Sequence, residues 1–304
     1  MRPSGLIISV VLLLALVVTP RLISSQEAPV PVVLWHGMGD SCCNPLSMGV
    51  IKSLIEENIP GVYVLSVRIG DSVVEDVENS FLMNLNKQID MVCKQFSNDP
   101  NLEMGFNAVG FSQGGQFLRG LVQRCSGLKV QNLISIGGQH QGVFGLPKCP
   151  VGLHICEYVR ELLTKGAYEE YVCACVIVQA EYWHDPLQED VYRRKSVFLA
   201  DINQERSVNT TYRENLIKLK NFVLVKFNNE TVVVPNESEW FGYYREGQEK
   251  EVIDLKDSDI YIKDKLGLKV LDESKRLHFL SLDGDHIMFT RKWFVENIIN
   301  PYLK

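Results

Sequence analysis

Short, largely hydrophobic runs recur along the chain, with longer stretches of mixed polarity between them. We predict buried parallel strands at residues 31–35, 62–67, 106–109 and 133–136, and two later strands at 222–227 and 277–282. Apolar residues at helical spacing predict helices over residues 49–57, 77–96 and 116–123. Strands that alternate with helices are typical of an α/β fold with a mostly parallel central sheet.

The regular alternation stops between residues 141 and 214. This segment is rich in Tyr, Arg and Glu and carries local helical signals, such as the one over residues 154–163. We interpret it as a helical insertion between the late strands that rests on the sheet. Residues 26–140 and 215–304 then form the core of the domain.

The first 25 residues have the pattern of a signal peptide. Arg2 precedes an apolar run over residues 6–18, and a small polar patch follows that ends at Ser25. The run is shorter than the roughly 20 apolar residues of a membrane span, and no later segment approaches that length. We expect cleavage near Ser25 and no transmembrane span, with an uncleaved signal anchor as the alternative.

Cysteines and glycosylation sequons fit the same secretory route. The chain has eight cysteines, and in an oxidising compartment most are expected to be paired. Their spacing resembles no metal site, so we expect neither a metal nor another cofactor. Sequons begin at Asn209, Asn229 and Asn236. A net charge of -6 gives no electrostatic footprint for nucleic acid.

A GxSxG motif at residues 110–114 marks a candidate nucleophile, Ser112. It follows the strand at 106–109 and precedes the helix at 116–123, which is the position of the nucleophile elbow in an α/β-hydrolase fold. The flanking glycines allow the tight turn that presents the serine hydroxyl. We therefore predict the α/β-hydrolase fold with Ser112 as nucleophile.

A serine hydroxyl needs a neighbouring base, and His286 is the candidate. It lies in the loop after the last predicted strand, where this fold places its histidine. We assign His140 a packing and hydrogen-bonding role and His36 a loop-shaping role. His184 lies in the insertion, and His154 and His278 have no special partner in this interpretation.

The third triad member should be a carboxylate between the serine and the histidine in chain order. Glu230 lies a few residues beyond the strand at 222–227, where such an acid belongs. Acidic residues with less favourable placement are rivals: Glu237, Glu239, Asp254, Asp283 and Asp285. For the oxyanion hole we expect the backbone N–H groups of Gln113, directly after the nucleophile, and Met38, in a glycine-flanked loop after the first strand.

Several longer stretches resemble the palmitoyl-protein thioesterases, lysosomal enzymes that remove fatty acyl groups from cysteine thiols. The insertion motifs QAEYWHDP and FLADINQER are the more specific ones, and they favour this type over its second paralogous branch or a general lipase. The stretches that carry the resemblance are residues 35–45, 110–120, 136–150, 179–186, 198–206 and 238–248.

The resemblance implies a triad of Ser112, Glu230 and His286, with Met38 and Gln113 in the oxyanion hole. It implies an aspartate where this chain has Glu230, and a longer side chain there requires the loop to adjust. It also implies three disulfides, Cys42 with Cys43, Cys93 with Cys125, and Cys149 with Cys156, and it leaves Cys173 and Cys175 outside the pattern.

The expected activity is hydrolysis of palmitoyl thioesters of proteins or peptides through an acyl-serine, with the 141–214 insertion as an acyl-binding cap. The expected location is the lysosome, with some secretion and with a sorting receptor that reads the N-glycans. The alternatives are a lipase or carboxylesterase acting on oxygen esters, and a catalytically impaired lipid-binding relative. The sequence leaves acyl-chain preference, protein substrates and oligomeric state open.

Overall fold

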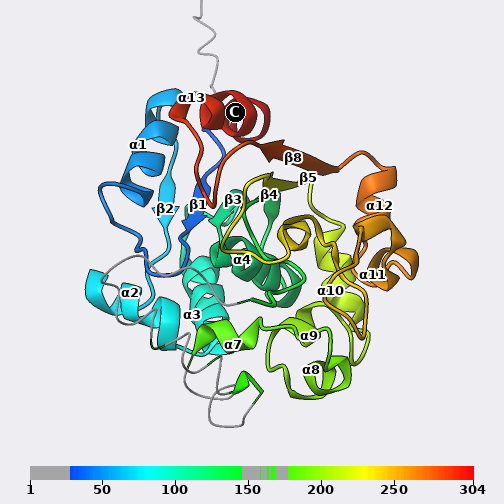
Figure 1. The fold of residues 1–304 in the computed structure, drawn as a ribbon. Coiled ribbons are helices and arrows are strands. Elements are labelled where there is room, and N and C mark those ends of the chain that lie inside the picture. The colour runs from blue at the N-terminus through cyan, green and yellow to red at the C-terminus, as the bar shows by residue number, and fades with distance from the viewer. Residues whose placement is uncertain (1–27, 146–157, 159–162, 164–165, 169–176) are drawn as a thin grey trace, which may run out of the picture.

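The computed structural model describes residues 28–145, 158, 163, 166–168 and 177–304. Its centre is a six-stranded sheet in which every neighbouring pair is parallel. The strand order is β2-β1-β3-β4-β5-β8 (Figure 1). All six predicted strands are present: β1 (Val32–Trp35), β2 (Val64–Ser66), β3 (Phe106–Phe111), β4 (Val130–Ile136), β5 (Asn221–Phe227) and β8 (Leu277–Leu282).

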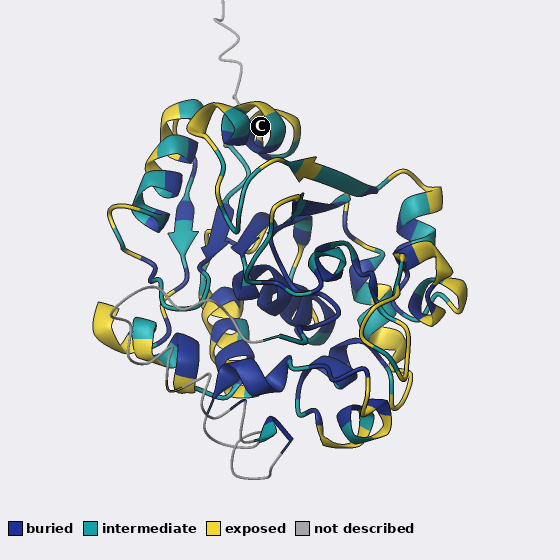
Figure 2. Ribbon diagram, in the orientation of Figure 1, coloured by how far each residue is buried: buried dark blue, intermediate teal, exposed yellow. Residues whose placement is uncertain are grey.

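Alternate residues of the strands pack into two separate hydrophobic clusters, one on each face of the sheet. In β1, Val33 and Trp35 belong to one cluster, and Val32 and Leu34 to the other. This period-2 division buries the strand on both sides, which explains its continuous hydrophobic run. The buried residues accordingly gather around the sheet and helix α4 (Gln113–Arg124) in Figure 2.

Helices cover both faces of the sheet. On one face lie α1 (Met48–Asn58), α13 (Arg291–Phe294) and the C-terminal π-helix η3 (Val295–Leu303). The opposite face packs against α4, α3 (Leu85–Asn98), α10 (Thr210–Leu216), α11 (Asp259–Ile262) and α12 (Leu268–Glu273). This layering confirms the predicted α/β-hydrolase class, with a parallel sheet between helices.

The single helix predicted over residues 77–96 is wrong, because the structure has two helices there. These are α2 (Val73–Leu82) and α3, separated at Met83 and Asn84. The side chain of Asn84 caps α3 by accepting from the N–H groups of Asn86 (3.1 Å) and Lys87 (3.4 Å). Asn84, a polar residue inside an apparently continuous helical pattern, therefore marks the start of a second helix.

Short helices follow β4 before the chain returns to β5. The described ones, apart from α10, are α7 (Val178–Glu181), α8 (Glu189–Lys195) and α9 (Leu199–Ile202). After β5 come η1 (Asn236–Trp240), η2 (Leu255–Asp257) and a small antiparallel pair of strands, β6 (Tyr243–Tyr244) and β7 (Val252–Ile253). The sequence analysis did not predict that pair.

The chain changes direction across the sheet at β1. From β1 it moves outward to β2, and then crosses back so that β3 pairs with the other side of β1. Such a switch point opens a crevice at the carboxyl ends of the two strands, where open α/β sheets bind their ligands. The loops after β1 and β3 are those that carry Met38 and Ser112.

Two disulfides join cysteines of the described residues, Cys42–Cys43 and Cys93–Cys125, as the resemblance implied. The remaining cysteine predictions, a Cys149–Cys156 pair with Cys173 and Cys175 outside the pattern, fall outside those residues. The same holds for His154 and for the predicted signal peptide. No helix in the described part of the chain is both long and apolar enough to cross a bilayer.

Candidate active site

Ser112 sits at a strained turn between β3 and α4. Its backbone has φ +52° and ψ -128°, a conformation that costs energy for any residue with a Cβ atom. The flanking glycines make the turn possible. A Cβ at Gly110 would lie 2.4 Å from the carbonyl oxygen of Gly114, and one at Gly114 would lie 2.3 Å from that of Trp35. The motif therefore fixes a serine at the carboxyl edge of the sheet, as a nucleophile elbow requires.

The structure brings Ser112, His286 and Glu230 together in a chain of hydrogen bonds. His286 Nε2 lies 2.8 Å from Ser112 Oγ, and His286 Nδ1 lies 2.6 Å from Glu230 Oε2. The Glu230 side chain is fully buried, whereas that of His286 is 15% exposed. A serine, a histidine and a carboxylate in this order can move a proton away from the hydroxyl and stabilise the imidazolium that forms.

Glu230 is held in place by its own loop as well as by His286. Its Oε1 accepts hydrogen bonds from the N–H groups of Val232 (2.6 Å) and Val233 (3.1 Å). Burial by itself raises the pKa of Glu230, but the hydrogen bond and charge of His286, together with Glu239 and the Val232 N–H, outweigh it and lower that pKa. The carboxylate is thus the favoured form, as an acid that orients a histidine must be.

The rival acids lie elsewhere or make other contacts. Asp285 Oδ1 accepts from the backbone N–H of His286 at 2.8 Å, so it shapes the loop. Asp254 and Asp283 are exposed, and Glu237 is half-buried in η1. Glu239 is the exception, since it is buried beside Glu230.

Met38 lies in the loop after β1, and Gln113 directly follows Ser112 at the start of α4. In the described part of the chain, no acceptor takes the backbone N–H of either residue. The Gln113 side chain donates to the carbonyl of Ser80 (3.0 Å) and accepts from the hydroxyl of Tyr182 (3.0 Å), which fixes the start of α4. Both N–H groups are therefore without an acceptor among the described residues, as the donors of an oxyanion hole must be before the substrate binds.

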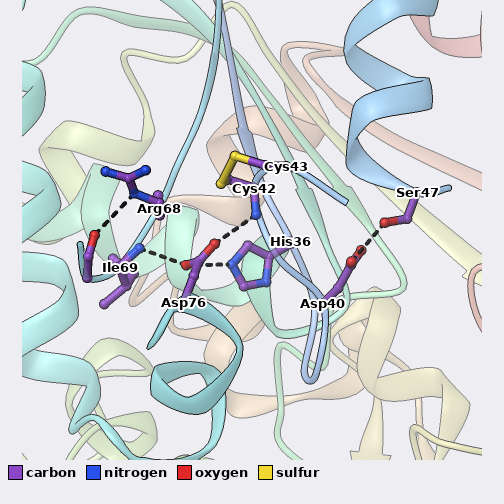
Figure 3. The surroundings of a disulfide bond; sticks show 9 residues. His36, Asp40, Cys42, Cys43, Ser47, Arg68, Ile69 and Asp76 are labelled. Atoms are coloured by element: carbon purple, nitrogen blue, oxygen red, sulfur yellow. Dashed lines mark hydrogen bonds and ion pairs between the residues drawn. A yellow bond between two sulfur atoms is a disulfide. The ribbon is translucent and has the colours of Figure 1, made fainter. Parts of the chain in front are cut away.

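Asp76, which the sequence analysis did not single out, anchors the Met38 loop. It is fully buried in α2, and Figure 3 shows it between His36, Ile69 and the Cys42–Cys43 disulfide. Its carboxylate accepts from His36 Nε2 (3.1 Å), the Ile69 N–H (2.7 Å) and the Cys42 N–H (2.8 Å). The contacts with His36 and Cys42 span 40 and 34 residues of sequence, so no local pattern could reveal them.

His140 and His184 have structural partners. His140 is buried, lies 2.9 Å from Ser135 Oγ and stacks on Phe241. Burial and the charge of Arg119 lower the pKa of His140 well below its usual value, so it stays neutral. His184 lies 2.7 Å from Glu189 Oε1.

His278 was expected to have no special partner, and that expectation is wrong. Its Nε2 lies 2.8 Å from Asn221 Oδ1, and its ring packs against that of Tyr302. The hydrogen-bond partner comes from the neighbouring strand β5, which the sequence alone does not align with β8.

Two cavities meet at Ser112. The larger, of about 580 Å³, is mainly apolar and is bounded by α1 and by the loop after β8, with lining residues that include Met38, Leu54, Phe111, Val232, His286 and Phe289. The smaller, of about 30 Å³, lies toward the insertion and is lined by residues such as Val143, Leu163, Gln179 and Tyr182. Both contain Met38, Ser112 and Val232, so an apolar chain bound in either would reach the nucleophile.

Among the described residues, the group of acids and histidines close enough to share an ion is Glu230, Glu239 and His286. Both ring nitrogens of His286 are already hydrogen-bonded, so we assign this group no metal.

The three sequon asparagines differ in how accessible they are. Asn209 and Asn229 are exposed. Asn236 is half-buried, and its side-chain amide donates to the Phe227 carbonyl at 3.2 Å. A glycan is therefore more easily accommodated at the first two positions.

Comparisons with known proteins agree over almost the whole chain. The family model described as palmitoyl protein thioesterase matches residues 31–286. Palmitoyl-protein thioesterase 1 of Caenorhabditis elegans is 50% identical over 291 residues, covering 96% of this chain and 97% of that protein. Palmitoyl-protein thioesterase 3 of Dictyostelium discoideum is 39% identical, covering 97% of this chain and 94% of that protein. The lysosomal thioesterase PPT2 homolog of Drosophila melanogaster is 28% identical, covering 92% of this chain and 94% of that protein.

Proposed function

Because the chain belongs to the palmitoyl-protein thioesterase family, we propose that it hydrolyses long-chain fatty acyl thioesters of cysteine in proteins or peptides. The observation that carries the proposal is the hydrogen-bonded series Ser112, His286 and Glu230 at the mouth of an apolar cavity. The series supplies a nucleophile and its base, and the cavity supplies the contacts that a fatty chain needs.

In the proposed reaction, Ser112 Oγ attacks the thioester carbonyl while His286 Nε2 takes its proton. The N–H groups of Met38 and Gln113 stabilise the oxyanion, the C–S bond breaks to give an acyl-serine, and the departing cysteine sulfur takes the proton from His286, which becomes neutral again. A water activated by His286 then attacks the acyl-serine and releases the fatty acid. Since a thiolate departs readily, protonation of the leaving group by His286 matters less here than for an ester.

We place the acyl chain in the apolar space beside Ser112, with the larger cavity as its main volume. At about 0.8 kcal/mol for each buried methylene, a palmitoyl tail contributes up to roughly 10 kcal/mol before the costs of binding. Val143 and Tyr182 border the smaller cavity from the side of the insertion. This contact supports the proposal that the insertion, residues 141–214, caps the acyl site.

We also propose a lysosomal location, reached through the secretory route with some secretion. The apolar leader, the cysteine pairs and the sequons support it, and a relative's name includes the word lysosomal. Exposed Asn209 and Asn229 are the better candidates for glycans that a sorting receptor reads, because the Asn236 amide is hydrogen-bonded to Phe227.

The test is an assay of the purified chain on a palmitoyl-cysteine peptide, beside the matching oxygen ester and a butyryl thioester. We expect the palmitoyl thioester to be the best substrate. Ser112→Ala should lower kcat by about 10⁶-fold. A fluorophosphonate probe should label Ser112 in the same preparation. Faster turnover of the oxygen ester would favour a lipase or carboxylesterase, and an unlabelled Ser112 would favour a lipid-binding relative without activity.

A further inference from the structure

Glu239, in η1, is tied to the strand that leads to the triad acid. It is 1% exposed, and its Oε2 accepts from the backbone N–H of Phe227 at 2.8 Å. Phe227 is the last residue of β5, and the chain reaches Glu230 directly afterwards. The carboxyl group of Glu239 is therefore fixed against the base of the Glu230 loop.

The second oxygen of Glu239 bears on whether this carboxyl group carries a proton. Oε1 is buried and takes no hydrogen bond from any donor in the described residues. Carboxyl oxygens of Glu239 and Glu230 and a ring nitrogen of His286 all lie within 4.8 Å of one another, so the two buried carboxyl groups are close neighbours. Carboxylates only accept, so two of them hydrogen-bond only when one carries a proton.

The charged groups that face Glu239 agree with this assignment. Burial is the largest cause that raises the pKa of Glu239, and the hydrogen bond and charge of Glu230 raise it further. The Phe227 N–H and the charge of Lys226 oppose them, but the net pKa lies well above the usual value. The pKa of Glu230, which is bonded to His286, is shifted in the other direction. Opposite pKa shifts in two neighbouring acids favour a single proton on the pair, carried by Glu239.

Resting on the hydrolase function proposed above, we propose that Glu239 is a neutral carboxylic acid that donates a hydrogen bond to the Glu230 carboxylate and thereby positions the triad acid. Glu239 touches neither the substrate nor Ser112, so it acts through Glu230. Its donated proton spreads the negative charge of Glu230 and weakens the pull of that charge on the imidazolium form of His286. The pH dependence of Ser112 reactivity therefore reports on the Glu239 side chain through Glu230 and His286.

The experiment measures the rate at which a fluorophosphonate labels Ser112 as a function of pH, in the full chain and in two Glu239 variants. Glu239→Gln keeps a donor and a carbonyl acceptor, so we expect an unchanged midpoint on the acid limb. Glu239→Leu has a similar size but no donor, so we expect the midpoint to rise by about one pH unit, with labelling about tenfold slower below it. Glu181→Gln, at a buried glutamate outside the triad, is the matched control and should leave the midpoint unchanged.

Two outcomes overturn the proposal. A lower midpoint in Glu239→Gln means that Glu239 is ionised, because that substitution would then remove a negative charge that stabilises the imidazolium. An unchanged profile in a folded Glu239→Leu variant means that the side chain is only structural.

Infrared spectroscopy keeps the proposal falsifiable if Glu239→Leu does not fold. We expect the protonated carboxyl band to be weaker in Glu239→Gln than in the native chain by the contribution of one group, and equal bands in the two proteins would contradict the proposal. The labelling rate reports on Ser112 whatever the substrate. Normal labelling without thioester hydrolysis therefore rejects the proposed substrate and leaves the role of Glu239 standing.

Discussion

Two buried carboxyl groups lie near different parts of the site and differ in how many hydrogen-bond donors surround them. Asp76, on the side of the Met38 loop, accepts from His36, Ile69 and Cys42. Glu239, on the side of Glu230, accepts from one backbone N–H and leaves its other oxygen without a donor among the described residues. Burial is similar in the two residues, so the number of donors is what separates them.

This difference in donors gives the two residues different roles. Asp76 acts as a structural clamp, whereas Glu239 takes part in the proton chemistry that we propose. Several donors around Asp76 hold three segments at fixed distances, whatever happens at the nucleophile. A carboxyl group with one donor can keep a proton and share it with the neighbouring acid. The Met38 side of the site is therefore held by a fixed set of hydrogen bonds, whereas we expect the Glu239 side to respond to pH.

Within this comparison, the largest expected effect comes from replacing Glu230, the acid beside Glu239. Glu230→Ala should lower kcat by about 10⁴-fold, because His286 loses the group that sets its tautomer and stabilises its charge. Glu230→Asp should retain more activity, with a loss on the order of 10²-fold if the shorter side chain falls about 1 Å short. Thioester turnover measures both, and unchanged activity in the alanine variant would reject Glu230 as the orienting acid.

Removing the clamp should affect folding and the nucleophile together. Asp76→Ala leaves the Ile69 and Cys42 N–H groups and His36 without their acceptor, at a cost of about 3 kcal/mol in the free energy of unfolding. Asp76→Asn keeps one acceptor oxygen and should lose less. Urea unfolding gives the stability, and fluorophosphonate labelling reports on the site. Equal unfolding free energies for the native chain and Asp76→Ala would contradict the clamp.

The last expected effect leaves the catalytic groups untouched and changes only how stability depends on pH, through a buried glutamate that belongs to neither side of the site. Glu181 is 2% exposed, and burial raises its pKa from 4.5 to about 8, against the opposing hydrogen bonds from Leu85 and Asn84. Between these values the folded chain binds more protons than the unfolded chain. This stabilisation is complete below pH 4.5 and is lost as the pH rises toward 8, by up to about 1.4 kcal/mol per pH unit.

Glu181→Gln should make the stability curve flatter over this range. Urea unfolding of both proteins between pH 5 and 8, an interval of about 3 units, isolates the contribution of Glu181 from those of other buried acids. Parallel curves for the two proteins would mean that Glu181 titrates normally in the folded chain.

The sequence revealed the parts of the fold that depend on local pattern. The six strands follow from hydrophobic runs, and the Ser112 turn follows from its glycines and its position between strand and helix. The break at Asn84 was missed, because a helix cap in an amphipathic pattern resembles an ordinary polar position. The β6–β7 pair was missed because each strand has only two residues.

The sequence did not reveal those parts of the site that depend on contacts between separate segments of the fold. Glu239 appeared only as a rival to Glu230, since nothing in the chain shows that η1 brings the two carboxyl groups together. Asp76 resembled any acidic residue in the first turn of a helix. Both roles depend on burial and on donors from distant segments, which a single sequence does not display.

The crowding at Gly114 limits where this enzyme can vary. A side chain there would collide with the carbonyl oxygens of Trp35 and His36, so the first turn of α4 rests directly on the backbone at the end of β1. The nucleophile and the loop that follows β1 consequently move as one unit. Substitutions that change acyl specificity are therefore expected in the cavity walls, around Leu54 or Val143. The residues of the nucleophile elbow itself tolerate almost no substitution.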